Sequence, residues 1–426
     1  MMKVNLDYGE KEMGLFISDT NLANFFSLKI SGEKASFETF ERALKAATPK
    51  LEDIVSEKRV CIILDDSTRK QPREQILKPL CERLKKAHFI QVLIATGTHK
   101  SLHNLELCEF IRGIVNSYSL NFDIAINDST NNNEFEYIGT TRRKTEVFVN
   151  KKAMSCDMFI VVSGMKPHYF GGYSNPVKNF LPGICSFETI RQNHCALIVE
   201  EDSIYGRHPW HPLPQKRQNP IAEDMLEGME LIIKNRYVFA LAFVGNEEII
   251  WAKAGEVKEV TCEGIKIIDK SMSFTTNPTK YLIVSPGKDE DKTFYVAQRS
   301  LELTKQVVNR ETEVLWLANI QGGIHDDPKL LPILKQNYEN IASKIKEKDA
   351  DFGLYKAFRF KNYLQRVSKV FVYSEYNHQD LQEIGTLPID DPQKIIDNWL
   401  EKDPAAKILV INNANKLAVG LCNKGK

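Results

Sequence analysis

The sequence predicts an α/β protein with two domains and mainly parallel sheets. The chain has 426 residues, more than one hydrophobic core usually organises, so two domains are expected. Hydrophobic residues make up 42% and charged residues 27%, a balance typical of globular proteins. Short β-branched segments alternate with longer amphipathic ones, which indicates strands joined by helices in a parallel sheet.

The first half of the chain contains four strand candidates. Residues 60–66 (VCIILDD) are an apolar run that ends in acids, and apolar residues then recur at helical spacing over 72–87. Further strands are predicted at 89–99 (FIQVLIATGTH), 122–128 (FDIAIND) and 156–165 (CDMFIVVSGM). Functional residues of parallel sheets gather at the carboxyl ends of strands. The polar clusters DDSTR, ATGTH and SGMKPH occupy such positions.

The pattern changes in the second half. Residues 248–270 are charged and strand-like, and SMSFTTNPTK then connects to a new series of strands and helices. We therefore expect an N-terminal domain at 1–272 and a C-terminal domain at 273–405. Residues 406–426 form a terminal strand and tail, which either complete the second domain or return to the first.

The composition excludes several partner classes. The net charge of +1 provides no electrostatic footprint for nucleic acid or an anionic membrane. The N-terminus lacks a signal-peptide pattern, and the apolar runs are far shorter than a membrane span. Eight cysteines without a CxxC pair are typical of free thiols in the cytoplasm. A small-molecule partner fits best.

The most informative segment is 164–194, GMKPHYFGGYSNPVKNFLPGICSFETIRQNH. It contains His168, His194, Lys166 and Lys178 among many glycines and prolines, a density that predicts an ordered loop close to a ligand. The helix start at SFETIRQNH could bind a phosphate. The alternative is a tight turn with incidental histidines.

Two other strand ends add candidate residues. Asp66 and Arg69 lie three positions apart, and arginine is a natural carboxylate partner, although a salt-bridged helix cap is equally consistent. A lone histidine such as His99 is usually structural. Together with His168 and His194 it could form a metal site, a general-base pair, or both.

The segment YGRHPWHPLPQ carries His208 and His211 at a spacing that could bind metal. The surrounding prolines and Trp210 favour a packed loop instead.

The combined motifs DDSTR, TGTH, KPHYFGGYSNPVKNFLPG and ETIRQNH resemble the nickel-pincer lactate racemase family. The resemblance continues through RQNPIAEDMLEGMELI and SPGKDEDKTFYVAQRSLE, so matches run in order from about residue 60 to 300. The block from His168 to His194 is the most specific.

The resemblance implies a tethered nickel pincer nucleotide (pyridinium-3,5-bisthiocarboxylic acid mononucleotide nickel). The two-domain layout suggests an active site in the interdomain cleft. Proteins that synthesise and deliver this cofactor would be partners of the chain in the cytoplasm. The implied roles are a cofactor tether at Lys178, a nickel ligand at His194, acid/base groups at His99 and His168, further cofactor contacts from Asp66, Thr68, Ser174 and Asn175, and substrate contacts from Arg69, Tyr295 and Arg299. Asp66 would hold the ribose or position Arg69.

Two departures from the family pattern concern the cofactor and the substrate. The family's Ser-Gly-Gly-x-Lys is replaced by Ser174-Asn175-Pro176-Val177-Lys178, and Pro176 has no N–H for a phosphate. The Asn175 side chain is one candidate to replace it. Arg299 stands four residues after Tyr295, where the family's lactate racemases have lysine.

These features predict a racemase or epimerase that inverts C2 of a 2-hydroxy acid, with a substrate larger than lactate, such as an aldonate or malate. Three alternatives stay open: a lactate racemase proper, a nickel-free α/β oxidoreductase or lyase, and a non-catalytic nucleotide- or metal-binding protein. No GxGxxG follows the first strand, so a dinucleotide site is disfavoured.

Overall fold

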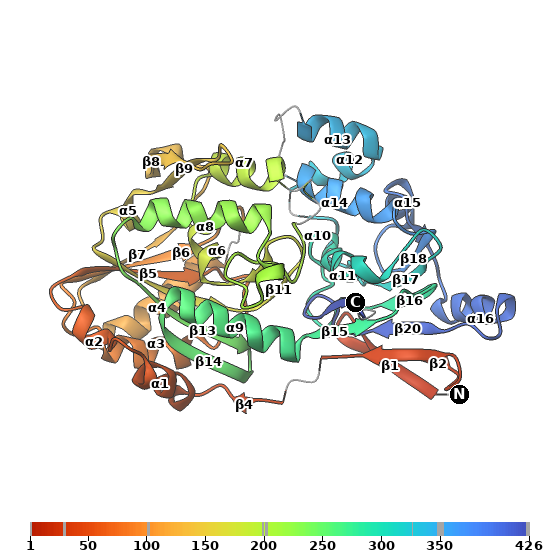
Figure 1. The fold of residues 1–426 in the computed structure, drawn as a ribbon, viewed down its shortest axis with the longest axis horizontal. Helices are drawn as coiled ribbons and strands as arrows, with labels where there is room; N and C mark the ends of the chain where they lie inside the picture. Colours follow the sequence, from red (N-terminus) through yellow and green to blue (C-terminus); the bar gives the residue numbers. More distant parts are fainter. Residues whose placement is uncertain are drawn as a thin grey trace. The chain divides into compact units, whose positions relative to one another are not determined.

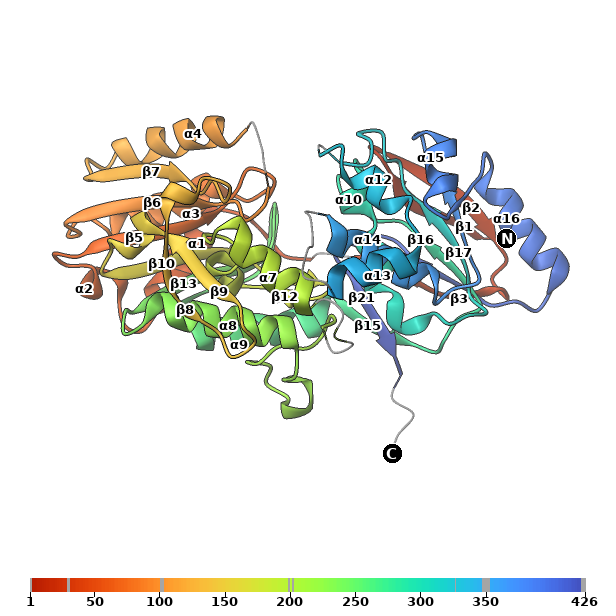
Figure 2. The ribbon, with the colours of Figure 1, turned by 90° about the horizontal axis from the view of Figure 1, so that it is seen from above.

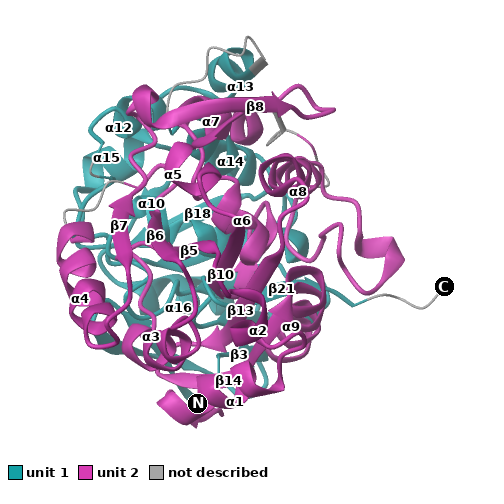
Figure 3. Ribbon diagram, turned by 90° about the vertical axis from the view of Figure 1, so that its left-hand side faces the viewer, with its two compact units in different colours: residues 1–29, 272–426 teal, residues 30–271 magenta. Residues whose placement is uncertain are grey.

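The computed structural model describes residues 2–28, 31–99, 103–197, 200, 203–325, 327–346 and 353–422. The chain divides into two compact units, which are described separately. Unit 1 comprises residues 1–29 and 272–426, and unit 2 comprises residues 30–271 (Figure 3). Among the described helices, none combines the length and apolar character needed to cross a membrane.

Unit 2 is built around one mixed sheet. In the described residues its strand order is β4-β14-β13-β10-β5-β6-β7. Strands β13, β10, β5, β6 and β7 run parallel, β14 pairs antiparallel with β13, and β4 pairs antiparallel with β14. The strands of the sheet are β4 (Glu33–Lys34), β5 (Arg59–Asp65), β6 (Phe89–Ala95), β7 (Phe122–Ile126), β10 (Met158–Gly164), β13 (Val238–Gly245) and β14 (Glu248–Glu256).

Helices cover both faces of this sheet. The helices of unit 2 are α1 (Phe37–Ala46), α2 (Leu51–Ile54), α3 (Arg73–Glu82), α4 (Asn104–Asn116), α5 (Lys151–Met154), α6 (Pro176–Phe180), α7 (Phe187–Leu197), α8 (Pro220–Ile233) and α9 (Val257–Ser271). Ile62 of β5 shares a core with α1 and α3. Phe159 of β10 packs edge-on against Phe180 of α6, with ring centroids 5.3 Å apart. Figure 1 shows α1 and α3 on one side of these strands and α6 and α8 on the other. Burial on both faces explains the continuous apolar runs of β5, β6 and β10.

Two antiparallel hairpins complete unit 2. They are β8 (Phe135–Thr140) with β9 (Glu146–Asn150), and β11 (Lys166–His168) with β12 (Gly172–Ser174). The second hairpin follows directly on the carboxyl end of β10, so it lies at the edge of the sheet where functional residues of parallel sheets gather.

Unit 1 contains a second sheet, whose described strands all run parallel in the order β19-β18-β17-β16-β20-β3. The strands of unit 1, inside and outside this sheet, are β1 (Met2–Tyr8), β2 (Lys11–Ile17), β3 (Leu22–Phe26), β15 (Ser273–Thr276), β16 (Tyr281–Val284), β17 (Glu313–Leu317), β18 (Lys369–Tyr373), β19 (Leu387–Pro388), β20 (Ile408–Ile411) and β21 (Ala418–Leu421). Its helices are α10 (Phe294–Ala297), α11 (Arg299–Leu303), α12 (Leu330–Leu334), α13 (Tyr338–Lys346), α14 (Leu354–Leu364), α15 (His378–Glu383) and α16 (Pro392–Lys402). The predicted α/β class with mainly parallel sheets is confirmed.

The position of the N-terminal strands differs from the predicted domain layout, in which residues 1–272 form one domain. Strand β3 pairs with β20, and Val4 and Leu6 of β1 share a buried cluster with Trp399 of α16. Figure 2 shows β1, β2 and β3 among the C-terminal elements. Strand β20 lies between β16 and β3, so the last part of the chain belongs to unit 1.

The prediction of strand-like structure over residues 248–270 is wrong for its second half. Strand β14 ends at Glu256, and α9 begins at Val257. The buried positions Val260, Ile265 and Ile268 recur at helical spacing. The β-branched residues in this stretch are typical of a strand, but they recur with the period of one face of a helix.

Candidate active site

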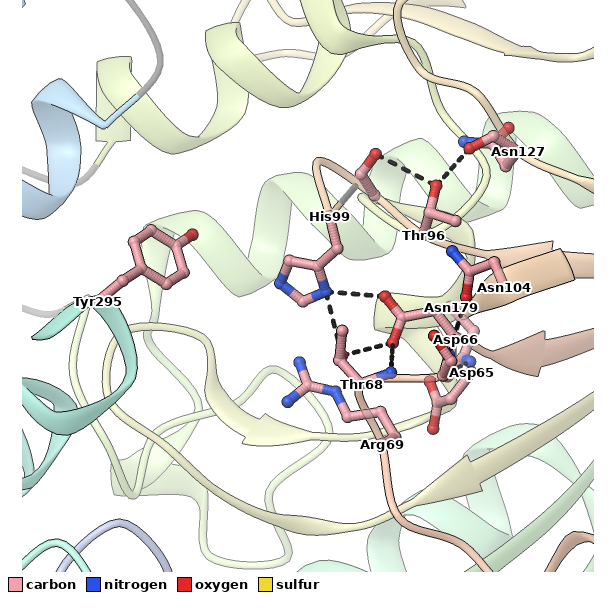
Figure 4. A network of polar contacts seen from close by, with 12 residues as sticks. Asp65, Asp66, Thr68, Arg69, Thr96, His99, Asn104, Asn127, Asn179 and Tyr295 are labelled. Atoms are coloured by element: carbon pink, nitrogen blue, oxygen red, sulfur yellow. Dashed lines mark hydrogen bonds and ion pairs between the residues drawn. The ribbon is translucent and has the colours of Figure 1, made fainter. Parts of the chain in front are cut away.

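The candidate site lies at the carboxyl ends of three adjacent strands of unit 2. Strand β5 lies between β10 and β6 in the sheet, and all three run parallel. Asp66 follows β5, His99 follows β6, and the β11–β12 hairpin with His168 follows β10. The expected convergence of these strand ends is therefore present, as Figure 4 shows for Asp66 and His99.

Buried Asp66 is hydrogen-bonded to the partly exposed ring of His99. The Oδ2 atom of Asp66 lies 2.9 Å from Nδ1 of His99, and its Oδ1 accepts hydrogen bonds from the backbone N–H and the hydroxyl of Thr68. Burial acts to raise the pKa of Asp66, but the charge and hydrogen bond of His99, with Arg69 and Thr68, lower it to about 2. An ionised Asp66 requires Nδ1 of His99 to donate. The other ring nitrogen, Nε2, is then the acceptor in the neutral ring.

Arg69 belongs to the same turn. Its backbone N–H donates to the carbonyl of Asp66 at 3.1 Å. The guanidinium of Arg73 donates to the carbonyls of Asp66 and Arg69 at 2.5 and 2.7 Å, which holds the turn in place. Figure 4 shows the side chains of Arg69 and His99 projecting to the same side of the turn.

A second cluster surrounds the ring of Phe170. The rings of His168 and His194 have centroids 4.5 and 5.0 Å from that of Phe170, and Nζ of Lys178 is 5.3 Å from it. Nδ1 of His168 accepts the backbone N–H of Gly171 at 3.1 Å. The sequence motif therefore brings His168, Lys178 and His194 to one place.

Helix α6 presents Lys178. Its N-cap is Asn175, whose Oδ1 accepts the N–H of Val177 and whose Nδ2 donates to the carbonyl of Tyr173, both at 2.8 Å. Both polar atoms of the Asn175 amide thus bind the local backbone, which differs from the expected role of this side chain as a phosphate ligand. Pro176 stands at the first helical position, where a missing N–H costs nothing.

The carboxylate of Asp65 joins α6 to the turn that carries Asp66 and Arg69. Asp65 accepts hydrogen bonds from Nδ2 of Asn179 at 3.0 Å and from Nε2 of Gln71 at 2.6 Å, and burial raises its pKa. The N–H of Gly97 donates to the carbonyl of Gly183 at 3.1 Å. These contacts tie the loop of His99 to the segment that carries Lys178.

His194 is oriented by a chain of buried polar groups. Its Nδ1 lies 2.9 Å from Oδ1 of Asn193, and Nδ2 of Asn193 donates to Asp224 at 2.7 Å. The amide oxygen can only accept, so Nδ1 of His194 carries the hydrogen and Nε2 offers a lone pair. A metal-binding histidine is commonly fixed in this way through its other nitrogen.

Tyr295 and Arg299 lie in unit 1, on α10 and α11. The hydroxyl of Tyr295 is 2.8 Å from that of Tyr355, and Nζ of Lys356 lies 4.1 Å from the centre of its ring. The Cζ atom of Arg299 is 5.9 Å from the same centre, and its buried Nε has no hydrogen-bond partner in the described part of the chain.

Two other candidate segments, the helix start at SFETIRQNH and the loop of His208 and His211, make local contacts. At the start of α7 the N–H of Phe187 donates to the carbonyl of Ser129, and the N–H of Thr189 donates to the hydroxyl of Ser186. His208 and His211 each accept a backbone N–H at Nδ1. Burial lowers the pKa of His208 to about 3, and these side chains serve the packing of their loop.

Three site-supporting residues escaped the sequence analysis, namely Asn193, Asp65 and Asn179. Asn193 directly precedes His194, and Asn179 directly follows Lys178. The only available signal was their adjacency to the chemical residues, because their partners Asp224 and Asp65 are distant in sequence.

The chain is similar in sequence to known proteins. Residues 8–206 match the model of the lactate racemase N-terminal domain. A lactate racemase from Thermoanaerobacterium thermosaccharolyticum is 26% identical over 299 residues, which is 67% of this chain and 67% of that protein. A lactate racemase from Lactiplantibacillus plantarum is 25% identical over 346 residues, or 76% of each chain.

Solved structures share the fold. The lactate racemase apoprotein from Thermoanaerobacterium thermosaccharolyticum aligns with a TM-score of 0.85 at 22% identity, covering 98% of this chain and 100% of that one. A protein from Thermotoga maritima aligns with a TM-score of 0.67 at 17% identity, covering 92% of this chain and 100% of that one.

Proposed function

We propose that this chain, which matches the lactate racemase N-terminal domain over residues 8–206 and is similar to two lactate racemases, is an isomerase of that family. It would invert C2 of a 2-hydroxy acid with a tethered nickel pincer nucleotide. The observation that carries the proposal is the Asp66–His99 pair, a histidine with an oriented lone pair beside Arg69. The same sheet edge carries His168, Lys178 and His194, so base, tether and metal ligand are supported by one unit.

His99 is the general base of this proposal. Its Nδ1 hydrogen is held by Asp66 at 2.9 Å, so Nε2 accepts the hydroxyl proton of the substrate while the C2–H bond breaks. Ionised Asp66 then stabilises the imidazolium that forms, as an orienting carboxylate does in other histidine-based sites.

His168 is the acid/base group for the opposite face. Its Nδ1 accepts the N–H of Gly171 at 3.1 Å, so the neutral ring carries its hydrogen on Nε2 and presents a donor to the substrate oxygen. To accept a proton at Nε2, His168 must exchange this hydrogen bond. A racemase needs both groups because the planar 2-keto acid is re-formed to either enantiomer.

Arg69 is proposed to bind the substrate carboxylate, because a guanidinium fork matches both carboxylate oxygens. Tyr295 and Arg299 are proposed as further substrate contacts on the strength of the family resemblance. Arginine at position 299 supports a substrate larger than lactate, such as an aldonate or malate, since its shape and donor geometry differ from those of lysine.

The residues of unit 2 fit the proposed cofactor. Nε2 of His194 offers a lone pair to nickel because Nδ1 is engaged by Asn193. A methyl group on Gly171 would lie 3.4 Å from Nδ1 of His168 and 3.6 Å from Nζ of Lys178, so this position borders both side chains. When bound, the cofactor would supply a hydride acceptor for C2. Thr68 and Asp66 would support the cofactor site by positioning His99, and Ser174 would contact the cofactor directly.

The proposal is tested with protein produced beside the cofactor-synthesis proteins, its proposed cytoplasmic partners. Intact mass is expected to show an adduct that is absent from Lys178→Ala, with one nickel per chain. Chiral chromatography of lactate, malate and aldonates then identifies which acid is inverted. Racemisation by unmodified, nickel-free protein would contradict the mechanism while leaving the isomerase class intact.

A further inference from the structure

The two short helices α10 and α11 of unit 1 form one continuous helical segment. Gln298 stands between them and has helical backbone angles, with φ −59° and ψ −19°. Its N–H donates to the carbonyl of Phe294 at 3.0 Å, and its carbonyl accepts the N–H of Leu301 at 3.1 Å. Residues three or four positions apart lie on the same face of a helix. The side chains that share one face here are those of Tyr295, Gln298, Arg299 and Glu302.

This face packs against helix α14 through polar contacts. The hydroxyl of Tyr295 lies 2.8 Å from that of Tyr355. Oε2 of Glu302 accepts a hydrogen bond from Nε of Arg359 at 2.8 Å and lies 2.5 Å from its Nη2. All four of these side chains are buried. A buried polar layer therefore lies between α10–α11 and α14, within unit 1.

Gln298 belongs to this face but makes no side-chain hydrogen bond. The residue is 2% exposed, and in the described part of the chain neither Oε1 nor Nε2 has a partner. A buried amide without partners is destabilising, because it has lost its hydrogen bonds to water and gained none in return. A rotation of this long side chain toward a ligand breaks no hydrogen bond, and binding the ligand satisfies the amide.

Two neighbours of Gln298 also have unused hydrogen-bonding atoms. Nε of Arg299 and Oε1 of Glu302 are buried without partners among the described residues. Together with the amide they provide two donors, Nε2 of Gln298 and Nε of Arg299, and two acceptors, Oε1 of Gln298 and Oε1 of Glu302.

This set of donors and acceptors distinguishes between classes of substrate. The methyl group of lactate uses none of the four atoms. The second carboxylate of malate only accepts hydrogen bonds, so it leaves both acceptors unpaired and meets the like charge of Glu302. A hydroxyl group both donates and accepts. Hydroxyl groups therefore match this set best.

We propose that Gln298 binds hydroxyl groups beyond C2 of the substrate, with Arg299 and Glu302 beside it, so that the substrate is a polyhydroxy acid of the aldonate class. This inference rests on the proposed function, in which Tyr295 and Arg299 contact the substrate. Gln298 directly precedes Arg299 and follows Tyr295 by three positions, so its amide shares the helix face of both contacts. A site built to bind a substrate hydroxyl rejects an analogue that lacks it, because its own polar groups are then left unpaired.

The test uses the full chain loaded with cofactor by co-expression, and three acids with the same four-carbon skeleton. Threonate has hydroxyls at C3 and C4, 2-hydroxybutyrate has neither, and malate has a second carboxylate. Wild type is expected to invert threonate with a kcat/KM about 100-fold or more above that for the other two. Gln298→Met keeps the length of the side chain and removes both polar atoms. It lowers kcat/KM for threonate by about tenfold or more and changes that for 2-hydroxybutyrate by less than about twofold.

Two controls separate a role in binding from a role in folding. Gln365→Met replaces an exposed glutamine at the end of α14 and retains the wild-type preference. Gln298→Met is expected to unfold at or above the wild-type temperature, since it removes polar groups that have no partner. A lower unfolding temperature would show that the amide supports the fold and would overturn the inference. A wild type without preference for threonate, or a Gln298→Met variant that keeps the preference, also overturns it.

The two proposals fail separately. Protein that lacks nickel and the Lys178 adduct after co-expression, or that inverts none of the three acids, contradicts the proposed function. Calorimetric titration with threonate and 2-hydroxybutyrate then still decides the inference, because binding needs no turnover, and equal affinities of wild type for the two acids overturn it. Protein that carries the adduct and inverts 2-hydroxybutyrate or malate as fast as threonate contradicts this inference alone.

Discussion

His99 and His168 are both proposed as acid/base groups of one unit, yet their rings are held by opposite hydrogen bonds. Nδ1 of His99 donates to the ionised carboxylate of Asp66, whereas Nδ1 of His168 accepts the N–H of Gly171. His99 is therefore set to accept a proton at Nε2, and neutral His168 presents a hydrogen there. The partner of Nδ1, rather than the histidine itself, therefore decides which half of the reaction each ring is ready for.

Removing either ring is expected to have the largest effect. His99→Ala and His168→Ala each lower steady-state racemisation by up to about 10⁴-fold, because each turnover needs one proton taken and one returned. Nickel content and the mass of the Lys178 adduct stay unchanged. In single turnovers each variant still oxidises one enantiomer to the 2-keto acid, and the two variants differ in which one. If both oxidise the same enantiomer, the two rings do not serve opposite faces.

Asp66→Asn tests the His99 half of the comparison. The amide cannot hold the Nδ1 hydrogen as a carboxylate does, so Nε2 ceases to be the reliable acceptor, and racemisation falls by about 10³-fold. The matched control is Thr68→Val, which removes a donor to Asp66 but leaves the His99–Asp66 bond, and its loss is below about tenfold. Equal losses in the two variants, measured as kcat, would show that Asp66 acts only through the turn.

Asn193→Ala extends the comparison to the third histidine. Without the amide oxygen the ring of His194 is free to reorient, and nickel affinity falls by about 10- to 100-fold. Nickel release to a chelator measures the effect on loaded protein. Gln192→Ala is the control, since Gln192 bonds only to Glu146 and Glu188 in the described residues. Nickel retention equal to the control would remove Asn193 from the site.

The lowered pKa of Asp66 also makes stability depend on pH. The pKa is about 2 in the folded chain against the usual 3.8, so its stabilisation is present above pH 4 and is lost as pH falls toward 2. The full contribution is about 2 kcal/mol. Between pH 5 and 3 the free energy of unfolding of Asp66→Asn should fall by about 1 kcal/mol less than that of wild type, measured in urea. Parallel falls would contradict the assigned pKa.

Gly171→Ala is expected to have the smallest effect and addresses the His168 half. Its methyl group meets Nδ1 of His168 and Nζ of Lys178 at ordinary contact distances. The rate therefore falls only by about a few-fold, mainly in the direction that uses His168 as base. A loss as large as that of His168→Ala would show that the space beside Gly171 is filled in the working enzyme.

Much of the site could be predicted because strand ends are visible in sequence. Buried runs that stop at Asp65, Ala95 and Gly164 place the following polar residues at one sheet edge. The motif from His168 to His194 was likewise apparent as one segment. The role of Asn175 is not apparent from the sequence, because a helix N-cap and a phosphate ligand use the same side-chain atoms.

Long-range pairing explains what could not be predicted. Residues 2–28 join unit 1 because β3 pairs with β20, more than 380 positions away (Ile408 with Leu22), and no local pattern encodes that choice. The sequence of helix α9 suggests a strand because β-branched residues are typical of strands. A few of them, such as Val260 and Ile265, fit the helical period as well as the strand period.

The α/β class, the strand-end clusters, and the residue types available for acid/base, tethering and metal-binding roles are visible in the sequence alone. These follow from hydrophobic period and local spacing, which act over a few residues. The orientation of each histidine depends on the folded chain. Asp66 with His99, Gly171 with His168, and Asn193 with Asp224 fix the ring nitrogens through hydrogen bonds that exist only after the chain has folded.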